Sequence, residues 1–309
     1  MNARLRPILY MPMEIASREL DSRLLLATLA VARGYEVVLG QKWLIEQNIH
    51  AMPPGLYLSK TLTQRDGIAM ADARSRGYVV AAIDEELPGL FMSAQQLRWM
   101  SSDAVDATDM IFVAGAGNSA AIAERFPTAA NKIVQAANPR WDMLRPNLRD
   151  YYAAEVADLK RRYGRFILIN TNFGFTNSEK GDAGQIVREQ ERLGKLDMKN
   201  LEHVDYVKSI ITMETENRQA IEQLLIALPI RFPEHRIVVR PHPSESADTW
   251  QKIVAGRQGI DVIREGAAVA WILASDVLIH TNCTTGVEAL ALDKSAICLV
   301  PSMSSANDR

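Results

Sequence analysis

The sequence contains only two cysteines, Cys283 and Cys298, among 309 residues. Two thiols cannot build the disulfide framework of a small secreted domain, so the composition fits a reducing compartment. Long apolar runs are also missing. The longest near the N-terminus, Leu24 to Ala32, has nine residues, against the roughly 20 that a membrane-spanning helix needs. The first residues lack the apolar region and cleavage site of a signal peptide. We therefore expect a cytoplasmic protein, with peripheral attachment to the inner face of a membrane left open.

Neither sign of charge is in clear excess, because 35 Lys and Arg residues are matched by 37 Asp and Glu residues, for a net charge of −2. A broad basic surface for nucleic acid would shift that balance, so no nucleic-acid partner is expected. Charged residues make up 23% of the chain and hydrophobic ones 48%, which argues against disordered, collagen-like and coiled-coil classes. At about 100–200 residues per domain, the length suggests two domains or one large one.

Motifs for metals and cofactors are missing as well. The five histidines stand at positions 50, 203, 235, 242 and 280, and none forms a metal-ligand motif with another histidine or a cysteine. The sequence has neither a phosphate-binding P-loop nor a Gly-x-Ser-x-Gly elbow. Residues Ala114 to Ala120 loosely fit a dinucleotide fingerprint, but they follow a late strand rather than the first one. We therefore predict no metal and no cofactor.

Short apolar runs alternate with helical patterns in both halves of the chain. Pro7 to Met13 reads as the first buried strand, and Phe166 to Asn170 begins a second series. This alternation is typical of parallel sheets covered by helices on both faces. The polar stretch after Asn138 breaks the pattern, so we place an N-terminal Rossmann-like domain at 1–140 and a C-terminal one at 141–309. We expect an α/β fold in which the two domains face a cleft, where ligands often bind.

Arg240 and His242 follow a predicted strand that ends at Val239, within the sequence Arg-Pro-His-Pro. Ligands of open parallel sheets bind at this edge of the sheet. The two prolines restrict the backbone around the imidazole, which favours a fixed contact with an anion. The alternative is a rigid turn whose histidine only satisfies nearby backbone groups.

Thr284, Thr285 and Glu288 follow the predicted strand that ends at Ile279. Hydroxyls and backbone N–H groups at the start of a helix bind phosphate, aided by the helix dipole. A glutamate one turn further on is suited to accept hydrogen bonds from a ribose. The alternative is a capping box from Thr285 to Glu288, in which the glutamate only satisfies backbone donors.

Two further strand ends carry polar residues. Asn170 and Asn172 open the loop after the first strand of the second half, with an ordinary turn as the alternative. Asp84, Glu85 and Glu86 follow a strand of the first half. Three adjacent acids repel one another, which raises the pKa of at least one and suits it to act as a general base. The alternative is a solvated acidic helix start that complements the dipole.

Five segments of the sequence together resemble the bacterial surface carbohydrate biosynthesis protein family. They are IDEE (83–86), NPRWDMLRP (138–146), FILINTNFGFTN (166–177), RPHPSE (240–245) and HTNCTTGVEALAL (280–292). The resemblance covers about residues 8–300 in order. The family has a GT-B-type glycosyltransferase architecture. Its second half is similar to capsule and lipopolysaccharide transferases that use CMP-activated 3-deoxy-ulosonic or nonulosonic acids.

The resemblance implies roles for the matching residues. Arg240 lies in the matching RPHPSE segment, and His242 and the hydroxyls of Thr284 and Thr285 would contact the donor phosphate. Glu288 would hold the ribose, and the acids at 84–86 would face the acceptor and supply the base. The implied reaction is metal-independent transfer of an acidic sugar from a CMP-linked nucleotide-sugar to a glycan or lipid-linked glycan acceptor, in capsule, lipopolysaccharide or exopolysaccharide synthesis.

The sequence departs from the family pattern at two places. Leu87 follows the acids where the family usually has a glycine, and family members usually continue past the last strand, so a shortened C-terminal domain is expected. Three alternatives therefore stay open. Two are enzymes on the same architecture, a nucleotide-sugar 2-epimerase and a polyol-phosphate transferase. The third is a non-catalytic sugar-nucleotide-binding protein.

Overall fold

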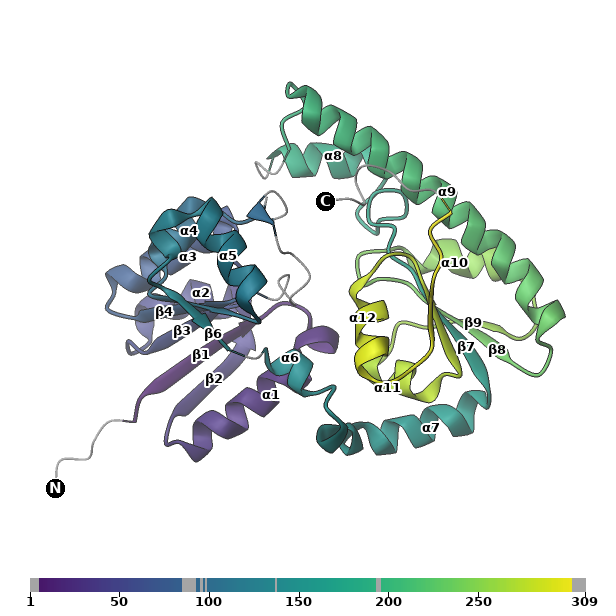
Figure 1. The fold of residues 1–309 in the computed structure, drawn as a ribbon, viewed down its shortest axis with the longest axis horizontal. Helices are drawn as coiled ribbons and strands as arrows, with labels where there is room; N and C mark the ends of the chain where they lie inside the picture. Colours follow the sequence, from purple (N-terminus) through teal and green to yellow (C-terminus); the bar gives the residue numbers. More distant parts are fainter. Residues whose placement is uncertain are drawn as a thin grey trace. The chain divides into compact units, whose positions relative to one another are not determined.

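The computed structural model describes residues 6–84, 93–94, 97, 99–136, 138–192 and 196–301. The chain divides into two compact units, Met1–Met143 (unit 1) and Leu144–Arg309 (unit 2). Figure 1 shows a sheet flanked by helices in each unit. The boundary expected from the sequence lies at 140/141. Among the described residues, no helix combines the length and the apolar character needed to cross a membrane.

Unit 1 contains a parallel sheet whose described strands run in the order β2-β1-β3-β4-β5-β6. The strands are β1 (Ile8–Met13), β2 (Glu36–Gln41), β3 (Leu56–Ser59), β4 (Val79–Ile83), β5 (Met110–Val113) and β6 (Ile133–Gln135). The chain moves outward from β1 to β2 and then returns past β1 to β3, so the winding reverses between β1 and β3. Ligands of such sheets bind at the carboxyl ends of the strands beside the reversal.

Helices cover both faces of the unit 1 sheet. They are α1 (Ala16–Ala32), α2 (Lys42–Asn48), α3 (Gln64–Ser75), α4 (Ser102–Ala107), α5 (Ala116–Arg125) and α6 (Pro139–Asp142), with short 3₁₀ helices η1 (Ile49–Ala51) and η3 (Pro127–Ala129). Tyr10 and Tyr57 pack in one cluster with residues of α2 to α5. Leu9 and Leu58, one residue away along each strand, pack with Ala30 of α1 on the other face. Because successive side chains of a strand point to opposite faces, both faces are buried and the strands read as continuous apolar runs.

Unit 2 contains a parallel sheet in the order β11-β10-β7-β8-β9. The strands are β7 (Phe166–Asn170), β8 (Arg236–Arg240), β9 (Ile260–Val262), β10 (Val277–His280) and β11 (Ala296–Cys298). The winding runs from β7 through β8 to β9 and then reverses to β10 on the other side of β7. The reversal in unit 2 therefore lies between β7 and β10.

Helices cover both faces of this second sheet as well. They are η4 (Pro146–Tyr152, a 3₁₀ helix), α7 (Ala153–Tyr163), α8 (Ala183–Arg192), α9 (Leu201–Arg231), α10 (Ala247–Val254), α11 (Ala268–Ala274) and α12 (Thr284–Ala291). Ile167 and Ile169 pack against Ile221 of α9 and Trp250 of α10. Phe166 contacts the ring of Trp271 instead, with ring centroids 6.0 Å apart. The predicted α/β class with two parallel sheets is confirmed.

Candidate functional site

The carboxyl edge of the unit 2 sheet brings several predicted site residues into one neighbourhood. In the strand register, Asn170 at the end of β7 lies opposite His280 of β10 on one side and opposite Arg240 of β8 on the other. The loops that carry His242 and the start of α12 therefore leave the sheet at the same edge as Asn170. This edge flanks the winding reversal, the place where ligands bind in open parallel sheets.

Two buried polar atoms at this edge have no hydrogen-bond partner among the described residues. They are Oδ1 of Asn170 and Oγ1 of Thr281, on side chains that are 5% and 6% exposed. Leaving a buried polar atom unpaired costs about 1–3 kcal/mol, so such atoms in a folded protein call for an explanation. A ligand with hydroxyl or amine groups would satisfy both. Asn172, two residues beyond Asn170, lies at the surface.

The turn from β10 into α12 places a helix start beside these atoms. Asn282 has a left-handed backbone with φ of 46°, a conformation that asparagine tolerates better than most residues. Cys283 is the N-cap of α12, and its side chain makes no capping hydrogen bond to the backbone. Thr284 and Thr285 lie in the first turn, and the Thr285 hydroxyl is 2.7 Å from the Cys283 sulfur. Burial raises the pKa of the Cys283 thiol, although the hydrogen bond with Thr285 opposes that rise.

The capping-box alternative for Thr285 and Glu288 is wrong, because the helix begins at Thr284 with Cys283 as its N-cap. The capping-box position N3 is then Gly286, and Glu288 lies two positions beyond it. Its side chain is buried. A role in holding a ribose stays a prediction.

His280 holds the start of α12 in place. Its Nδ1 accepts the backbone N–H of Cys283 over 3.4 Å, and burial lowers the pKa of its imidazole, which is therefore neutral at pH 7. The ring packs on the first turn of the helix at Gly286. A Cβ atom built on Gly286 would lie 2.3 Å from Nε2 of His280, so this contact requires glycine.

The loop after β8 fixes His242 from several directions. The backbone N–H of His242 donates to Oε1 of Glu245 over 3.0 Å. The backbone N–H of Ser244 donates to Nδ1 of His242 over 3.2 Å, and the Ser244 hydroxyl lies 2.7 Å from the same nitrogen. A ring with its proton on Nε2 satisfies both contacts. Arg264, just after β9, donates to the backbone carbonyl of Pro243. The two prolines are therefore not the only constraints on the conformation of this loop, because these hydrogen bonds constrain it as well.

Arg240 makes its hydrogen bonds within unit 2. Its guanidinium donates to the backbone carbonyls of Glu265 and Gly266 and lies over the ring of Trp271, 4.9 Å from the centroid. Burial lowers the pKa of Arg240 to about 10, so the group stays charged at pH 7. These contacts anchor the loop between β9 and α11, and a phosphate contact for Arg240 stays a prediction.

Glu214 anchors the loop after β7 and is a residue that the sequence analysis does not single out. It lies in α9, and its Oε2 accepts the backbone N–H groups of Phe175 and Thr176 over 3.0 and 2.8 Å. The hydroxyl of Thr176 donates to the same oxygen over 3.1 Å. Burial raises the pKa of Glu214 to about 7, with a further rise from nearby Glu245, while these hydrogen bonds oppose it.

Asp84, the first of the three predicted catalytic acids, directly follows β4 at the edge of the unit 1 sheet. Asp84 is 2% exposed, and its Oδ2 accepts the indole N–H of Trp99 over 3.2 Å. Glu85 and Glu86 lie outside the described residues. The described part of the acidic trio is thus a buried aspartate with a structural partner.

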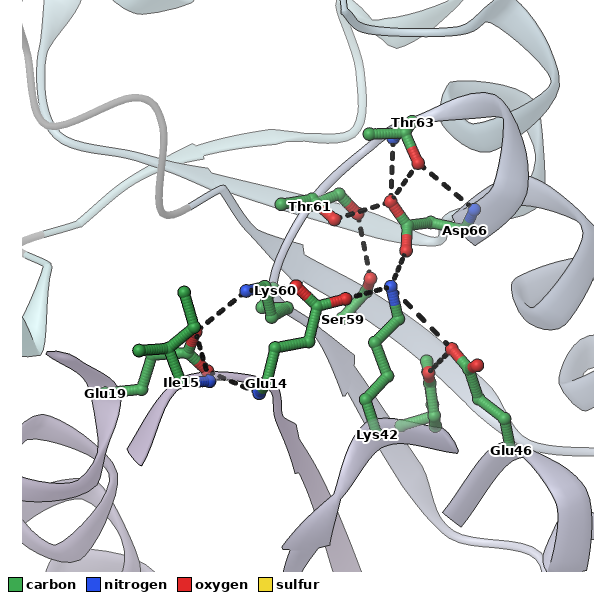
Figure 2. Close-up of polar contacts among 11 residues, drawn as sticks. Glu14, Ile15, Glu19, Lys42, Glu46, Ser59, Lys60, Thr61, Thr63 and Asp66 are labelled. Carbon is green, nitrogen blue, oxygen red and sulfur yellow. Dashed lines mark hydrogen bonds and ion pairs between the residues drawn. The ribbon is translucent and has the colours of Figure 1, made fainter. Parts of the chain in front are cut away.

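A network of buried charges lies at the winding reversal of unit 1, at the ends of β1, β2 and β3 (Figure 2). Lys60 lies 2.8 Å from both Glu14 and Glu19, measured from its Nζ to the carboxylate oxygens. Lys42 contacts Glu14 over 3.2 Å and also pairs with Asp66. Asp66 in turn forms a capping box with the N-cap of α3, Thr63. No sequence motif marks this network.

Glu14 is the member of this network that is exposed, with 47% of its side chain accessible. Burial disfavours its ionised form, but Lys60 and Lys42 more than compensate and lower the pKa of Glu14 to about 2. Glu14 is therefore ionised throughout the physiological range. A carboxylate that is so reluctant to take up a proton is a poor general base at neutral pH.

No family model and no curated protein matches this chain, but solved structures do. It is similar to S. aureus MnaA in a co-structure with UDP, with 14% identity and a TM-score of 0.59 over 96% of this chain and 79% of that one. It is also similar to UDP-GlcNAc 2-epimerase of Methanocaldococcus jannaschii in complex with UDP-GlcNAc and UDP, with 12% identity and a TM-score of 0.53 over 94% of this chain and 82% of that one. For a variant of the wall teichoic acid polymerase TagF, the identity is 9% and the TM-score 0.56, over 95% of this chain and 70% of that one.

These likenesses concern the fold. The chain has the GT-B-type arrangement of two Rossmann-like α/β domains in its sequence order, and the prediction of that fold class is confirmed. Sequence identities this low do not establish that the proteins share a substrate or a reaction.

Proposed function

We propose that this chain is a sugar-nucleotide enzyme of surface-glycan synthesis, and that it transfers a sugar from a nucleotide donor to a glycan or lipid-linked glycan acceptor. The observation that carries the proposal is the pair of buried, unpartnered atoms Asn170 Oδ1 and Thr281 Oγ1 at the winding reversal of unit 2. Hydroxyl and amine groups of a nucleotide-sugar would supply the missing hydrogen bonds. The similar structures that contain UDP support this class of ligand.

The donor phosphate is proposed to bind at the start of α12. The positive end of the helix dipole and the hydroxyls of Thr284 and Thr285 favour an anion there. His242 adds an Nε2–H donor from the neighbouring loop. Donors that are fixed before the reaction stabilise the charge that develops on a leaving phosphate, because no reorganisation is needed as the bond breaks.

The donor that we propose is a CMP-linked acidic sugar. This choice rests on the resemblance of RPHPSE (240–245) and HTNCTTGVEALAL (280–292) to transferases that use such donors. The structure supports a nucleotide-sugar at this edge and leaves the base to experiment.

The acceptor hydroxyl needs a carboxylate that can take up its proton. Because Asp84 is buried and bonded to Trp99, we propose Glu85 and Glu86 for this role ahead of Asp84. Glu85→Gln and Glu86→Gln, separately, should leave nucleotide affinity unchanged, and loss of the base should lower the transfer rate by about 10²–10⁴-fold. Full activity in both variants would rule the assignment out.

A nucleotide-sugar 2-epimerase is the second candidate, because one of the similar structures is the UDP-GlcNAc 2-epimerase of Methanocaldococcus jannaschii. An epimerase converts its nucleotide-sugar without a glycan acceptor, so the two candidates differ in what they consume. Incubation with a UDP-sugar alone, followed by analysis of the configuration at C2 of the nucleotide-bound sugar, distinguishes them. Conversion without acceptor would favour the epimerase.

Calorimetric titration with CMP, CDP, UDP and GDP tests the proposed function. The wild-type protein should bind CMP selectively, and His242→Ala should weaken that binding by about tenfold or more, since a hydrogen bond to a charged group contributes about 1.5–3 kcal/mol. Preference for UDP would favour the epimerase, and preference for CDP a polyol-phosphate transferase. No binding of any of the four would contradict a sugar-nucleotide site.

A further inference from the structure

The segment Pro241-His242-Pro243 has a single backbone N–H, that of His242, because proline has none. This N–H donates to Oε1 of Glu245 over 3.0 Å. In return, the backbone N–H of Glu245 donates to the carbonyl of His242 over 2.8 Å. Glu245 thus closes the turn that carries the His242 imidazole with two hydrogen bonds, one accepted by its side chain and one donated by its backbone.

Glu245 joins this turn to two other segments of unit 2, the loop after β7 and α10. Its side chain is 0% exposed. Besides His242, its Oε1 accepts the hydroxyl of Thr171, just after β7, over 2.8 Å. Its Oε2 accepts the side-chain N–H of Asn177 and the indole N–H of Trp250 in α10, both over 3.1 Å. One carboxylate therefore sets the loop after β7, the His242 turn and α10 relative to one another.

Each oxygen of the Glu245 carboxylate accepts two hydrogen bonds. The side-chain amide of Asn177 cannot be flipped to turn its oxygen toward Glu245, since its Nδ2 also donates to the carbonyl of Ser246 over 3.1 Å. All four donors are neutral groups. A buried anion held by neutral donors is an expensive way to stabilise a fold, but it is an effective way to fix the geometry of the groups around it.

We propose that Glu245 is a positioning residue that holds His242 with its Nε2–H directed to a ligand phosphate. The inference rests on the proposed function and deepens it, because it names the group that orients the phosphate contact. The ligand class is a nucleoside mono- or diphosphate. Glu245 itself touches protein groups, so its effect on binding passes through His242.

Glu245→Gln tests the proposal. The new amide group would face two of the four donors, so the turn should loosen. Two measurements follow this change. The first is the ¹⁵N signals of the His242 imidazole in the ligand-free protein, which should move from the single Nε2–H form toward the mixture of a free histidine. The second is the affinity for CMP divided by that for cytidine, which should fall about tenfold or more while cytidine itself binds as before.

Leu225→Ala is the matched control. Leu225 lies in α9 and belongs to the core of unit 2, so the variant should lose stability while the imidazole signals and the CMP-to-cytidine ratio stay at the wild-type values. If Glu245→Gln does not fold, Trp250→Phe takes its place. It removes one donor to Oε2, keeps an aromatic ring in the core, and should change both measurements in the same direction by a smaller amount.

The outcomes separate this inference from the proposed function. A folded Glu245→Gln protein with unchanged imidazole signals and an unchanged ratio would overturn the positioning role. A wild-type protein that binds none of CMP, CDP, UDP and GDP would instead overturn the proposed function. The imidazole signals would still decide whether Glu245 orients His242.

Discussion

Glu214 makes the stability of unit 2 depend on pH in the physiological range. Burial raises its pKa from the ordinary 4.5 to about 7, so the folded state binds this proton more tightly than the unfolded state does. The stability that comes from the protonated form is complete below about pH 4.5 and is lost as the pH rises through about 7. A pKa difference of about 2.5 corresponds to about 3 kcal/mol, at roughly 1.4 kcal/mol per pKa unit.

Glu214→Gln removes this titration with little other change. The three short hydrogen bonds of Glu214 all end on Oε2, whereas Oε1 receives one longer bond of 3.3 Å. A glutamine can therefore place its carbonyl oxygen at the Oε2 position and keep the three short bonds. The variant should differ least from the wild-type protein near pH 5 and exceed its free energy of unfolding by up to about 3 kcal/mol near pH 8.

Urea denaturation of both proteins between pH 5 and pH 8 measures this difference. Glu216→Gln serves as the control, because Glu216 is exposed on the same helix and its replacement should leave the pH profile parallel to the wild type. If the Glu214→Gln profile is also parallel to the wild type, the carboxyl group does not titrate in this range in the folded protein, and the reasoning is refuted.

Two further predictions concern single contacts. Gly286→Ala would ordinarily favour a helix by about 1 kcal/mol, but the added Cβ would overlap the His280 ring. We expect a net loss of about 1–3 kcal/mol in urea denaturation, and a gain in stability would contradict the contact. Lys60→Met would leave the buried carboxylate of Glu19 without its partner and should destabilise unit 1 by about 3–5 kcal/mol. Arg76→Met, which breaks an exposed pair, should have little effect on the melting temperature, and equal losses in the two variants would argue against the buried network.

The sheets and their edges could be predicted because the information is local. Runs such as Phe166–Ile169 are apolar throughout, as is typical of strands buried on both faces. The parallel order then places Asn170 beside His280 at one edge. The i, i+3, i+4 spacing of apolar residues predicts a helix over 204–228, and α9 spans Leu201–Arg231, continuing past Pro229 for its final residues.

The anchoring carboxylates could not be predicted because their partners are distant in sequence. Glu245 and Thr171 are 74 positions apart, and Glu214 and Thr176 are 38 apart. Lys60 and Glu19 are separated by 41 positions. A charged residue that a pattern assigns to the surface can be buried when tertiary contacts supply its donors, and nothing in the local sequence reports those donors. Of these carboxylates, Glu245 is the one that lies within a sequence motif, RPHPSE (240–245).

A crystal structure of the chain with CMP, or with whichever of the four nucleotides binds most tightly, tests the central claim most directly. The account predicts the phosphate at the first turn of α12 within hydrogen-bond distance of Nε2 of His242. It also predicts ligand donors on Asn170 Oδ1 and Thr281 Oγ1, the two atoms left unpaired in the free protein. A nucleotide bound elsewhere, with these two atoms still unpaired, would contradict it.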